Sequence, residues 1–233
     1  MTEDAEGRTP TRPHSQTLDR GLRMLEILAE ADRPLTIAAL AAALEVHRSI
    51  AYRILRTLED HRLVRRTVDG SCELDVGMAT LARSVSGDLQ SAALPELAKV
   101  ANEAGMTAFL VVPDGSDCVT LVSVEPRHSV AAVAQRPGTR HPLDRGAPGL
   151  ALLAGSPARP GERPEVPEAR RNGYSRSRGE VIPGLTAVAV PVLSGTRGTI
   201  AAVAVVFLSD DIDEPAIADR LQKAARTIAA EVP

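Results

Sequence analysis

The chain has 233 residues, a mass of 24.6 kDa and a formal net charge of −3. This length suffices for one large domain or two small ones, and the near-neutral charge excludes a protein that is basic throughout. There is no tryptophan, and only two tyrosines and two phenylalanines, so alanine, valine and leucine must supply the core. Because each alanine buries little apolar area, we expect assembly with a second copy to contribute to stability.

The N-terminal residues, the apolar stretches and the cysteines indicate the cellular compartment of the protein. Residues 1–14 are polar and rich in charge and proline, which is typical of a disordered tail and unlike a secretory signal. The longest apolar stretch, Thr199–Leu208, is half a membrane span at most. Cys72 and Cys118 lie far apart, without a histidine at metal-ligand spacing, which predicts reduced thiols. We therefore expect a soluble cytoplasmic protein without a metal, a cofactor or a membrane partner.

A helical period of apolar residues runs from residue 18 to residue 29 and ends at Pro34. Thr36 is placed to cap the start of a second, short helix over 37–44. A break at 45–47 leads to a third helix over 48–61, which is expected to bury Ile50, Ile54, Leu55 and Leu58. The apolar stripe of the first helix consists of Leu18, Leu22, Leu25, Leu28 and Ala29.

Two strand-like runs, 63–68 and 71–74, flank the dipeptide Asp69-Gly70, which is a good short-range signal for a β-hairpin. Three helices followed by such a hairpin predict a winged helix-turn-helix over residues 15–75. In this motif the third helix lies across the second and acts as the recognition helix.

The charge of this region is concentrated in one part of it. Residues 15–75 hold nine arginines and ten acidic residues, a net charge of −1, whereas residues 46–66 carry +4. Arginine pairs bidentately with guanine, and serine and tyrosine hydroxyls reach base edges or phosphates. Two arginines at the start of the wing, Arg65 and Arg66, are placed for backbone phosphates. A solvated charged surface is the alternative to DNA binding. The outward face of the third helix consists of Arg48, Ser49, Tyr52, Arg53 and Arg56.

After the wing, an amphipathic linker helix is predicted over 76–90, with a bend at Gly87, followed by a separate helix that Gly105 ends. From Thr107 the period becomes that of strands, in TAFLVV, CVTLVSVE and SVAAVA. A helix over 148–154, a long loop over 155–183, a hairpin of TAVAVPVL and TIAAVAVVFL and a closing helix over 212–232 complete the chain. The second half is therefore α+β, with helices beside an antiparallel sheet.

The chain resembles the isocitrate-lyase-regulator (IclR) family of transcriptional regulators. The resemblance rests on SQTLDRGLRMLEIL, on PLTIAALAAALEVHRSIAYRILRTLEDHRLVRR with the wing, and on GTRHPLDRGAPGLALLAG and GYSRSRGEVIPGLTAVAVPV. It covers about residues 15–231. It implies a winged helix, a linker helix and a GAF-like effector-binding and oligomerisation domain over 91–233, in homodimers or tetramers that bind pseudo-palindromic operators.

The resemblance also implies an effector pocket. Family members that bind small carboxylates line it with backbone amides at a loop-to-helix junction, whereas Pro148 of this chain has no amide hydrogen there. The matching strand positions are apolar, so a larger effector with apolar surface is expected, such as an aromatic or branched-chain acid or its derivative. The implied pocket residues are Val133, Ala147, Pro148, Gly149, Ser177, Ala187, Ala204 and Val206.

Two other functional classes compete with this interpretation. An enzyme is disfavoured because no nucleophile, zinc or phosphate-loop motif is present. His128 and His141 are interpreted as surface histidines, and Cys118 as a small buried hydrophobic residue. The second alternative is a ligand-independent DNA-binding regulator, whose C-terminal domain serves only for oligomerisation.

Overall fold

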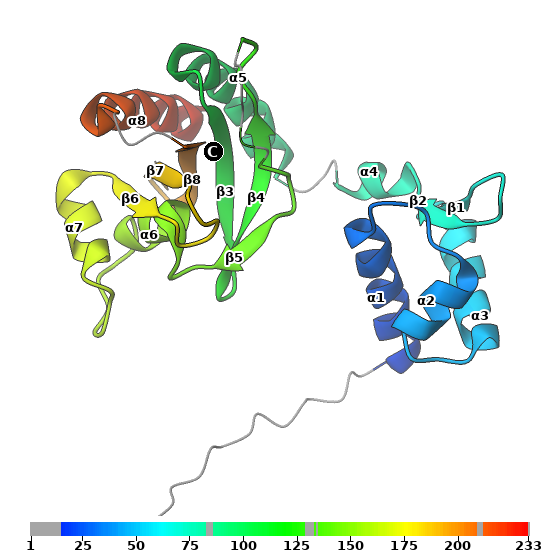
Figure 1. Ribbon diagram of the computed structural model, residues 1–233. Helices are drawn as coiled ribbons and strands as arrows, with labels where there is room; N and C mark the ends of the chain where they lie inside the picture. The colour runs from blue at the N-terminus through cyan, green and yellow to red at the C-terminus, as the bar shows by residue number, and fades with distance from the viewer. Residues whose placement is uncertain (1–14, 83–85, 129–132, 134, 209–211, 233) are drawn as a thin grey trace, which may run out of the picture. The chain divides into compact units, whose positions relative to one another are not determined.

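The computed structural model describes residues 15–82, 86–128, 133, 135–208 and 212–232 (Figure 1). The chain divides into two compact units, residues 1–85 and 86–233, each with its own core. The predicted tail over 1–14 lies outside the described residues.

The N-terminal unit is a winged helix-turn-helix, as predicted. Its hairpin is antiparallel, with Val64 opposite Leu74 and Arg66 opposite Cys72. The short helix α4 follows the wing. The elements are α1 (Gln16–Glu30), α2 (Ile37–Ala43), α3 (Arg48–Asp60), β1 (Val64–Arg66), β2 (Cys72–Leu74) and α4 (Gly77–Ala82).

Local hydrogen bonds define the helix starts in this unit. The Thr36 hydroxyl accepts from the Ala39 amide at 3.2 Å, which confirms the predicted cap of α2. At the start of α3, the His47 ring nitrogen Nδ1 accepts from the Ser49 amide at 3.3 Å. Leu35 exchanges two backbone hydrogen bonds with Cys72, at 2.9 and 2.7 Å, and so attaches the segment before α2 to the wing.

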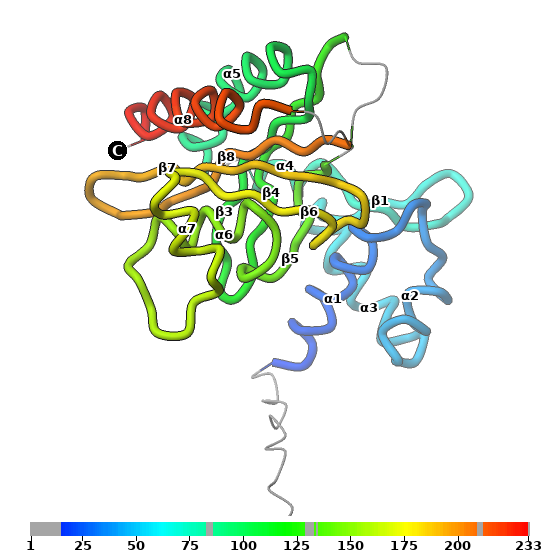
Figure 2. Tube along the Cα trace, turned by 60° about the vertical axis from the view of Figure 1, so that its left-hand side comes forward, coloured from blue at the N-terminus to red at the C-terminus, as the bar shows by residue number. Residues whose placement is uncertain are grey.

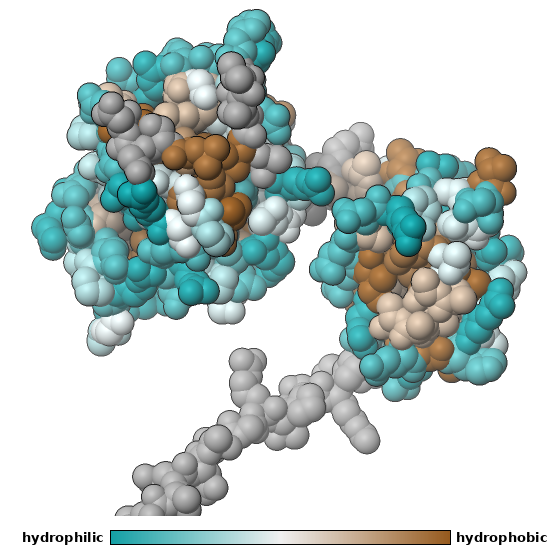
Figure 3. All heavy atoms as spheres, viewed as in Figure 1, coloured by the Kyte–Doolittle hydropathy of each residue, from teal (hydrophilic) through white to brown (hydrophobic). Residues whose placement is uncertain are grey.

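The buried faces of α1 and α3 differ from the predicted ones. Helix α1 buries Gly21, Met24 and Leu28, while Leu18 and Leu22 are 62% and 51% exposed. Of the predicted stripe, Leu28 is buried and Leu25 packs against the core, whereas Met24, which was not predicted, lies in the middle of the buried face. In α3, Ala51 is buried in place of Ile50, which is 37% exposed. Figure 3 shows apolar atoms at the surface over α1 and α2.

The C-terminal unit is built on one antiparallel sheet of six strands, in the order β5-β4-β3-β8-β7-β6 (Figure 2). The predicted hairpin of TAVAVPVL and TIAAVAVVFL is its β7–β8 pair, and the predicted strands TAFLVV and CVTLVSVE form its β3–β4 pair. The elements are α5 (Gly87–Ala104), β3 (Thr107–Asp114), β4 (Asp117–Val124), β5 (Arg140–Pro142), α6 (Gly146–Ala154), α7 (Glu165–Asn172), β6 (Ser175–Arg178), β7 (Thr186–Ser194), β8 (Gly198–Phe207) and α8 (Glu214–Glu231).

Helices cover both faces of this sheet. Helices α5 and α8 pack together on one face, and α6 packs on the other (Figures 1 and 2). Strand β8 contributes to the core on both faces of the sheet. Val203 and Val205 face α5 and α8, and Ala202 and Ala204 face α6. This two-sided burial explains why β8 is apolar at consecutive positions. The small side chains on the α6 face allow that helix to approach the sheet closely.

Three predicted segments differ from the structure. The linker helix over 76–90 is not one element, because α5 begins at Gly87, after Ser86 with its φ of 51°, and runs on to Ala104. Leu89 therefore lies in the core of the C-terminal unit. The predicted loop over 155–183 contains α7, which Gly173 ends at a φ of 75°, and β6, a strand that alternates buried serine with exposed arginine. The predicted strand SVAAVA lies outside the described residues except for Val133.

Candidate DNA-binding surface and effector pocket

The outward face of α3 carries the polar residues predicted for it. All five are exposed, and they begin in the first turn of the helix. Arg48, Arg53 and Arg56 make no ion pair with any residue that the structure describes. Ile50 also lies at the surface of this helix, an exposure that the sequence analysis missed because an isoleucine in an amphipathic helix is usually buried. Its apolar side chain is of the kind that contacts thymine methyl groups.

The two wing arginines are exposed as well, but both are paired with carboxylates. Arg65 forms an ion pair with Glu73, the residue directly opposite it in the hairpin. Arg66 donates from Nε to Glu59 of α3 at 2.7 Å, and its guanidinium lies 5.3 Å from the centre of the Tyr52 ring. The bond to Glu59 raises the pKa of Arg66. Arg66 thus connects the wing to the candidate recognition helix.

A small pocket lies beside the N-terminus of α6, with a volume of about 40 Å³. It combines an apolar wall with a few polar groups, which is the usual composition of a ligand site, although such sites are commonly about 300–1,000 Å³. The loop over 179–185 supplies much of the wall. The lining residues are Phe109, Gln135, His141, Gly146, Pro148, Ser177, Glu180, Val181, Ile182, Leu185, Ala187 and Val206.

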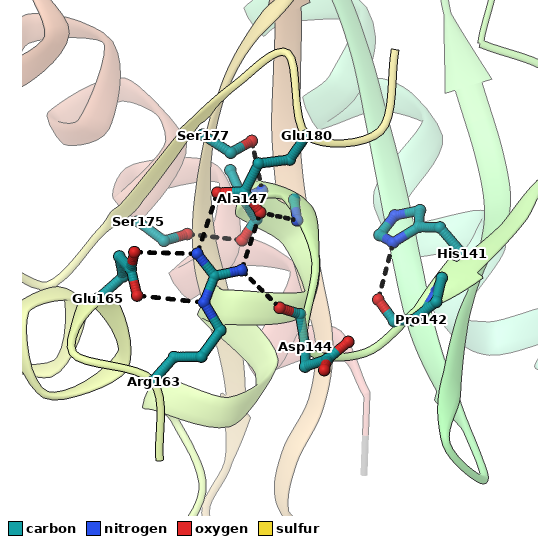
Figure 4. A network of polar contacts seen from close by, with 10 residues as sticks. His141, Pro142, Asp144, Ala147, Arg163, Glu165, Ser175, Ser177 and Glu180 are labelled. Carbon is teal, nitrogen blue, oxygen red and sulfur yellow. Dashed lines mark hydrogen bonds and ion pairs between the residues drawn. The ribbon is translucent and has the colours of Figure 1, made fainter. Parts of the chain in front are cut away.

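The first amides of α6 are occupied by side chains of the protein itself (Figure 4). The Gly146 amide donates to the Glu180 carboxylate at 2.9 Å, and the Ala147 amide donates to the Ser177 hydroxyl at 2.7 Å. The third residue, Pro148, has no amide hydrogen. Gly146 has a φ of 75°, and a β-carbon added there would lie 2.7 Å from Val181, so glycine is required where this loop meets the helix.

Arg163 holds the Glu180 carboxylate in place (Figure 4). Its Nη1 donates to Glu180 at 3.0 Å and its Nη2 at 3.2 Å. The same guanidinium donates to Glu165 at 2.9 and 3.1 Å and to the Asp144 carbonyl at 2.8 Å. Hydrogen bonding to Arg163 lowers the pKa of Glu180 and that of Glu165, and it raises the pKa of Arg163.

The structure brings together only part of the effector set implied by the resemblance. Pro148, Ser177, Ala187 and Val206 line the pocket. Ala147 and Ala204 are fully buried in the layer between α6 and the sheet. The other two members of the set are placed as follows: Gly149 approaches the Leu143 backbone, and Val133 accepts from Thr107 through its carbonyl group.

The acidic member of the pocket was missed because its role depends on distant partners. Glu180 lies in a segment predicted as a loop, 34 residues from Gly146 and 17 from Arg163. One local signal was present: Val181 and Ile182 follow Glu180 directly, and Leu185 comes three residues later. Such an apolar run is uncommon in a solvated loop.

His141 and Cys118 pack against each other beside the pocket. His141 lies on β5 and is only 8% exposed, so its interpretation as a surface histidine is wrong. Its ring nitrogens lie 3.2 and 3.3 Å from the Cys118 sulfur. Cys118 is buried, as predicted, and burial raises the pKa of its thiol to about 12. The described residues contain no cluster of acidic, histidine and cysteine side chains suited to a metal ion.

A winged helix-turn-helix with an exposed arginine face, joined to a sheet domain with a small pocket, defines a DNA-binding regulator with an effector domain. Comparisons with known proteins agree. The IclR helix-turn-helix domain model matches residues 17–67, and the model of the bacterial transcriptional regulator IclR C-terminal domain matches residues 158–232. The chain belongs to the IclR family of transcriptional regulators.

Two curated relatives support this membership. The chain is 30% identical to the probable transcriptional regulator SauR of Cupriavidus necator, over 80% of this chain and 83% of that protein. It is 25% identical to the HTH-type transcriptional regulator XynR of Escherichia coli, over 91% of this chain and 95% of that protein. Both alignments cross the two units, so the order of the domains is shared as well.

Solved structures share the fold. An IclR transcriptional regulator of Alicyclobacillus acidocaldarius matches with a TM-score of 0.81 and 25% identity, over 95% of this chain and all of that one. An IclR homologue of Microbacterium hydrocarbonoxydans, solved with 4-hydroxybenzoate, matches with a TM-score of 0.80 and 24% identity, over 93% and 98% of the two chains. No helix among the described residues is long and apolar enough to span a membrane.

Proposed function

We propose that this regulator reads operator DNA with the outward face of α3 and that a small molecule bound beside α6 modulates this binding. The observation that carries the first part is the set of exposed arginines on α3, which are unpaired among the described residues. Arginine at such positions pairs bidentately with guanine in the major groove. The contacts to bases come from Arg48, Ser49, Tyr52, Arg53 and Arg56.

The wing supplies contacts to the DNA backbone in this proposal. Arg65 and Arg66 exchange their carboxylate partners for phosphates when DNA binds, which fixes the position of α3 without reading sequence. Two copies bind a pseudo-palindromic operator, as a homodimer or within a tetramer. This role requires no catalysis, and it places the protein in the cytoplasm with the DNA that it regulates.

The test of base reading compares single arginine variants on two DNAs, a site selected by the wild-type protein from random DNA and an unselected duplex of equal length. Arg48→Ala or Arg53→Ala should weaken binding to the selected site by about 1–3 kcal/mol and change binding to the unselected duplex much less. Arg23→Ala, which removes an exposed arginine from α1, is the matched control. Equal losses on both DNAs would contradict base reading by α3.

The effector in this proposal has a substantial apolar body. Phe109, Ile182 and Val206 line the pocket, and apolar surface buried there contributes about 25 cal/mol per Å². The Microbacterium homologue with bound 4-hydroxybenzoate supports an aromatic ligand. Because the pocket is smaller than such a ligand, binding requires the loop over 179–185 to move outward. Small dicarboxylates and 2-oxo acids should bind weakly, since a buried carboxylate without paired donors costs several kcal/mol.

The alternative is a regulator that responds to no ligand. Measurements of the melting temperature with and without candidate ligands distinguish it from a ligand-responsive regulator. A ligand of the native state raises the melting temperature with its concentration, and an effector also changes the affinity for the selected DNA. A panel of aromatic and branched-chain compounds that changes neither quantity would favour a C-terminal unit that serves only for oligomerisation.

A further inference from the structure

The pocket beside α6 faces a carboxylate of the protein itself. The start of a helix presents free amide hydrogens and a partial positive charge, and both attract anions. In α6 these groups are already used: Glu180 accepts from Gly146, Ser177 accepts from Ala147, and Pro148 has no amide hydrogen. The first three positions of the helix therefore offer no free donor to a ligand.

The arginine next to this site has no free donor either. Its Nε donates to Glu165, its Nη2 to Glu165 and Glu180, and its Nη1 to Glu180 and the Asp144 carbonyl. One arginine thus serves two carboxylates, so these three groups together carry a net charge of −1 beside the pocket (Figure 4). Glu180 has 26% of its side chain exposed, so water screens this charge only in part.

The rest of the lining does not compensate for that charge. Among the described residues that line the pocket there is no lysine or arginine. The His141 ring is engaged with Cys118 and with the Pro142 carbonyl, at 3.1 Å from its Nδ1. A ligand carboxylate at the α6 end would therefore meet a like charge and no free helix amide or guanidinium, and only the neutral Ser177 hydroxyl and Gln135 amide could donate to it. The like charge and the occupied cationic and helix donors both oppose its burial.

We propose that Glu180 excludes carboxylates from the α6 end of this pocket, so that the effector is a molecule with an apolar body and an uncharged polar group at that end. This inference rests on the proposed function, in which the pocket binds an effector. Glu180 is thus a specificity-determining residue. Its carboxylate fills the position that an acidic ligand would need, and the loop that carries it contributes Val181 and Ile182 to the apolar wall.

The test uses two probes with the same ring, 4-hydroxybenzamide and 4-hydroxybenzoate, which differ at neutral pH in one charge. Calorimetry on the full chain should show the amide binding at least about tenfold tighter than the acid to the wild-type protein. In Glu180→Ala, the Gly146 amide and the Arg163 N–H groups that donate to Glu180 become available to a ligand. This variant should bind the acid more tightly than the amide. Glu180→Gln removes the charge at nearly the same size, and in it the preference should become weaker.

Glu165→Ala is the matched control, because Glu165 pairs with the same arginine but does not line the pocket. It should still prefer the amide, because Glu180 keeps its charge and still accepts from the Gly146 amide. Tighter or equal binding of the acid by the wild-type protein would overturn the inference, as would the same ratio in wild type, Glu180→Gln and Glu180→Ala. Failure of both probes to bind any variant would overturn it as well. Titration of the selected DNA with the same preparations tests the proposed DNA-binding role separately.

Discussion

The arginines of the N-terminal unit fall into two groups, those without an ion-pair partner among the described residues and those paired with carboxylates. Arg48, Arg53 and Arg56 belong to the first group, and Arg65 and Arg66 to the second. For the first group, contact with DNA requires no bond within the protein to be broken. For the second, each phosphate contact replaces an existing ion pair, so the wing contributes less affinity than its charge alone suggests.

The double variant Arg65→Ala/Arg66→Ala tests this division. It should weaken binding to the selected and the unselected DNA by the same factor, because phosphate contacts carry no sequence information. The slope of log affinity against log salt concentration should fall by about 0.9 for each phosphate that the wing no longer neutralises. An unchanged slope would show that both arginines keep their carboxylate partners on DNA, and it would remove the wing from the interface.

The pH dependence of stability tests the state of Glu180. Its pKa is lowered in the folded protein by Arg163 and by the Gly146 amide, so the folded state favours the ionised carboxylate. The stabilisation is therefore present above the ordinary glutamate pKa of about 4.3 and is lost as the pH falls through the lower, folded value. The melting temperature of wild type should exceed that of Glu180→Gln at neutral pH, and the difference should decrease in acid. A difference independent of pH would contradict an ionised Glu180.

At the scale of elements, the junction between α6 and the loop over 179–185 depends on the absence of a side chain at Gly146. Gly146→Ala imposes a strained φ and a close contact with Val181, whereas Gly161→Ala imposes a similar φ of 79° with open space around it. The strained φ costs about 1–2 kcal/mol in each variant. Chemical unfolding should show the larger loss of stability in Gly146→Ala, and equal losses would contradict the close packing of the loop on α6.

Elements that are specified by neighbouring residues could be predicted from the sequence, whereas elements that depend on distant residues could not. Thr36 and Asp69-Gly70 define a helix start and a hairpin by themselves, and both predictions were confirmed. Strand β6 has no apolar run of its own and exists because it pairs with β7, so its sequence alone indicates a loop. The inward face of α1 depends on which side chains α3 and the wing present to it, which the helical period alone does not determine.

The candidate sites show the same contrast. The exposed face of α3 followed from one helix and its charges, so its polar residues could be named from the sequence. The pocket joins residues from β3, β5, α6, β6, β7 and β8 and from the loop over 179–185. Its acidic group is held by Arg163, from a segment predicted as loop. The tertiary structure was needed to bring these groups together.

Specific binding to an operator requires two copies of the chain. A single winged helix buries too little surface against DNA for tight specific binding, and half-sites lie about 34–36 Å apart or a multiple of it. The apolar residues of the predicted linker helix, Met78, Leu81, Val85 and Leu89, are expected from the sequence to form one self-association surface. Leu89 is instead buried in its own unit, and Val85 lies outside the described residues. Leu18 and Leu22 of α1 are exposed, and we propose them as a further apolar surface for self-association.

Sedimentation tests this assembly. The wild-type protein should be a dimer or larger at micromolar concentration, and Leu18→Ser/Leu22→Ser should shift the equilibrium toward monomer. Leu193→Ser, at an exposed position of β7 in the C-terminal unit, serves as the control for the removal of a surface leucine. A wild-type monomer that still binds the selected DNA tightly would rule out the requirement for two copies.

Sequence recognition by α3 is tested by selecting binding sites from random DNA with the wild-type protein and with Arg48→Ala/Arg53→Ala/Arg56→Ala, at one salt concentration. The wild-type protein should enrich an inverted repeat whose half-sites are separated by one helical turn of DNA or a multiple of it. The triple variant should enrich no sequence while it still binds DNA weakly at low salt. No enrichment by the wild-type protein, or the same repeat enriched by both, would contradict sequence recognition by α3.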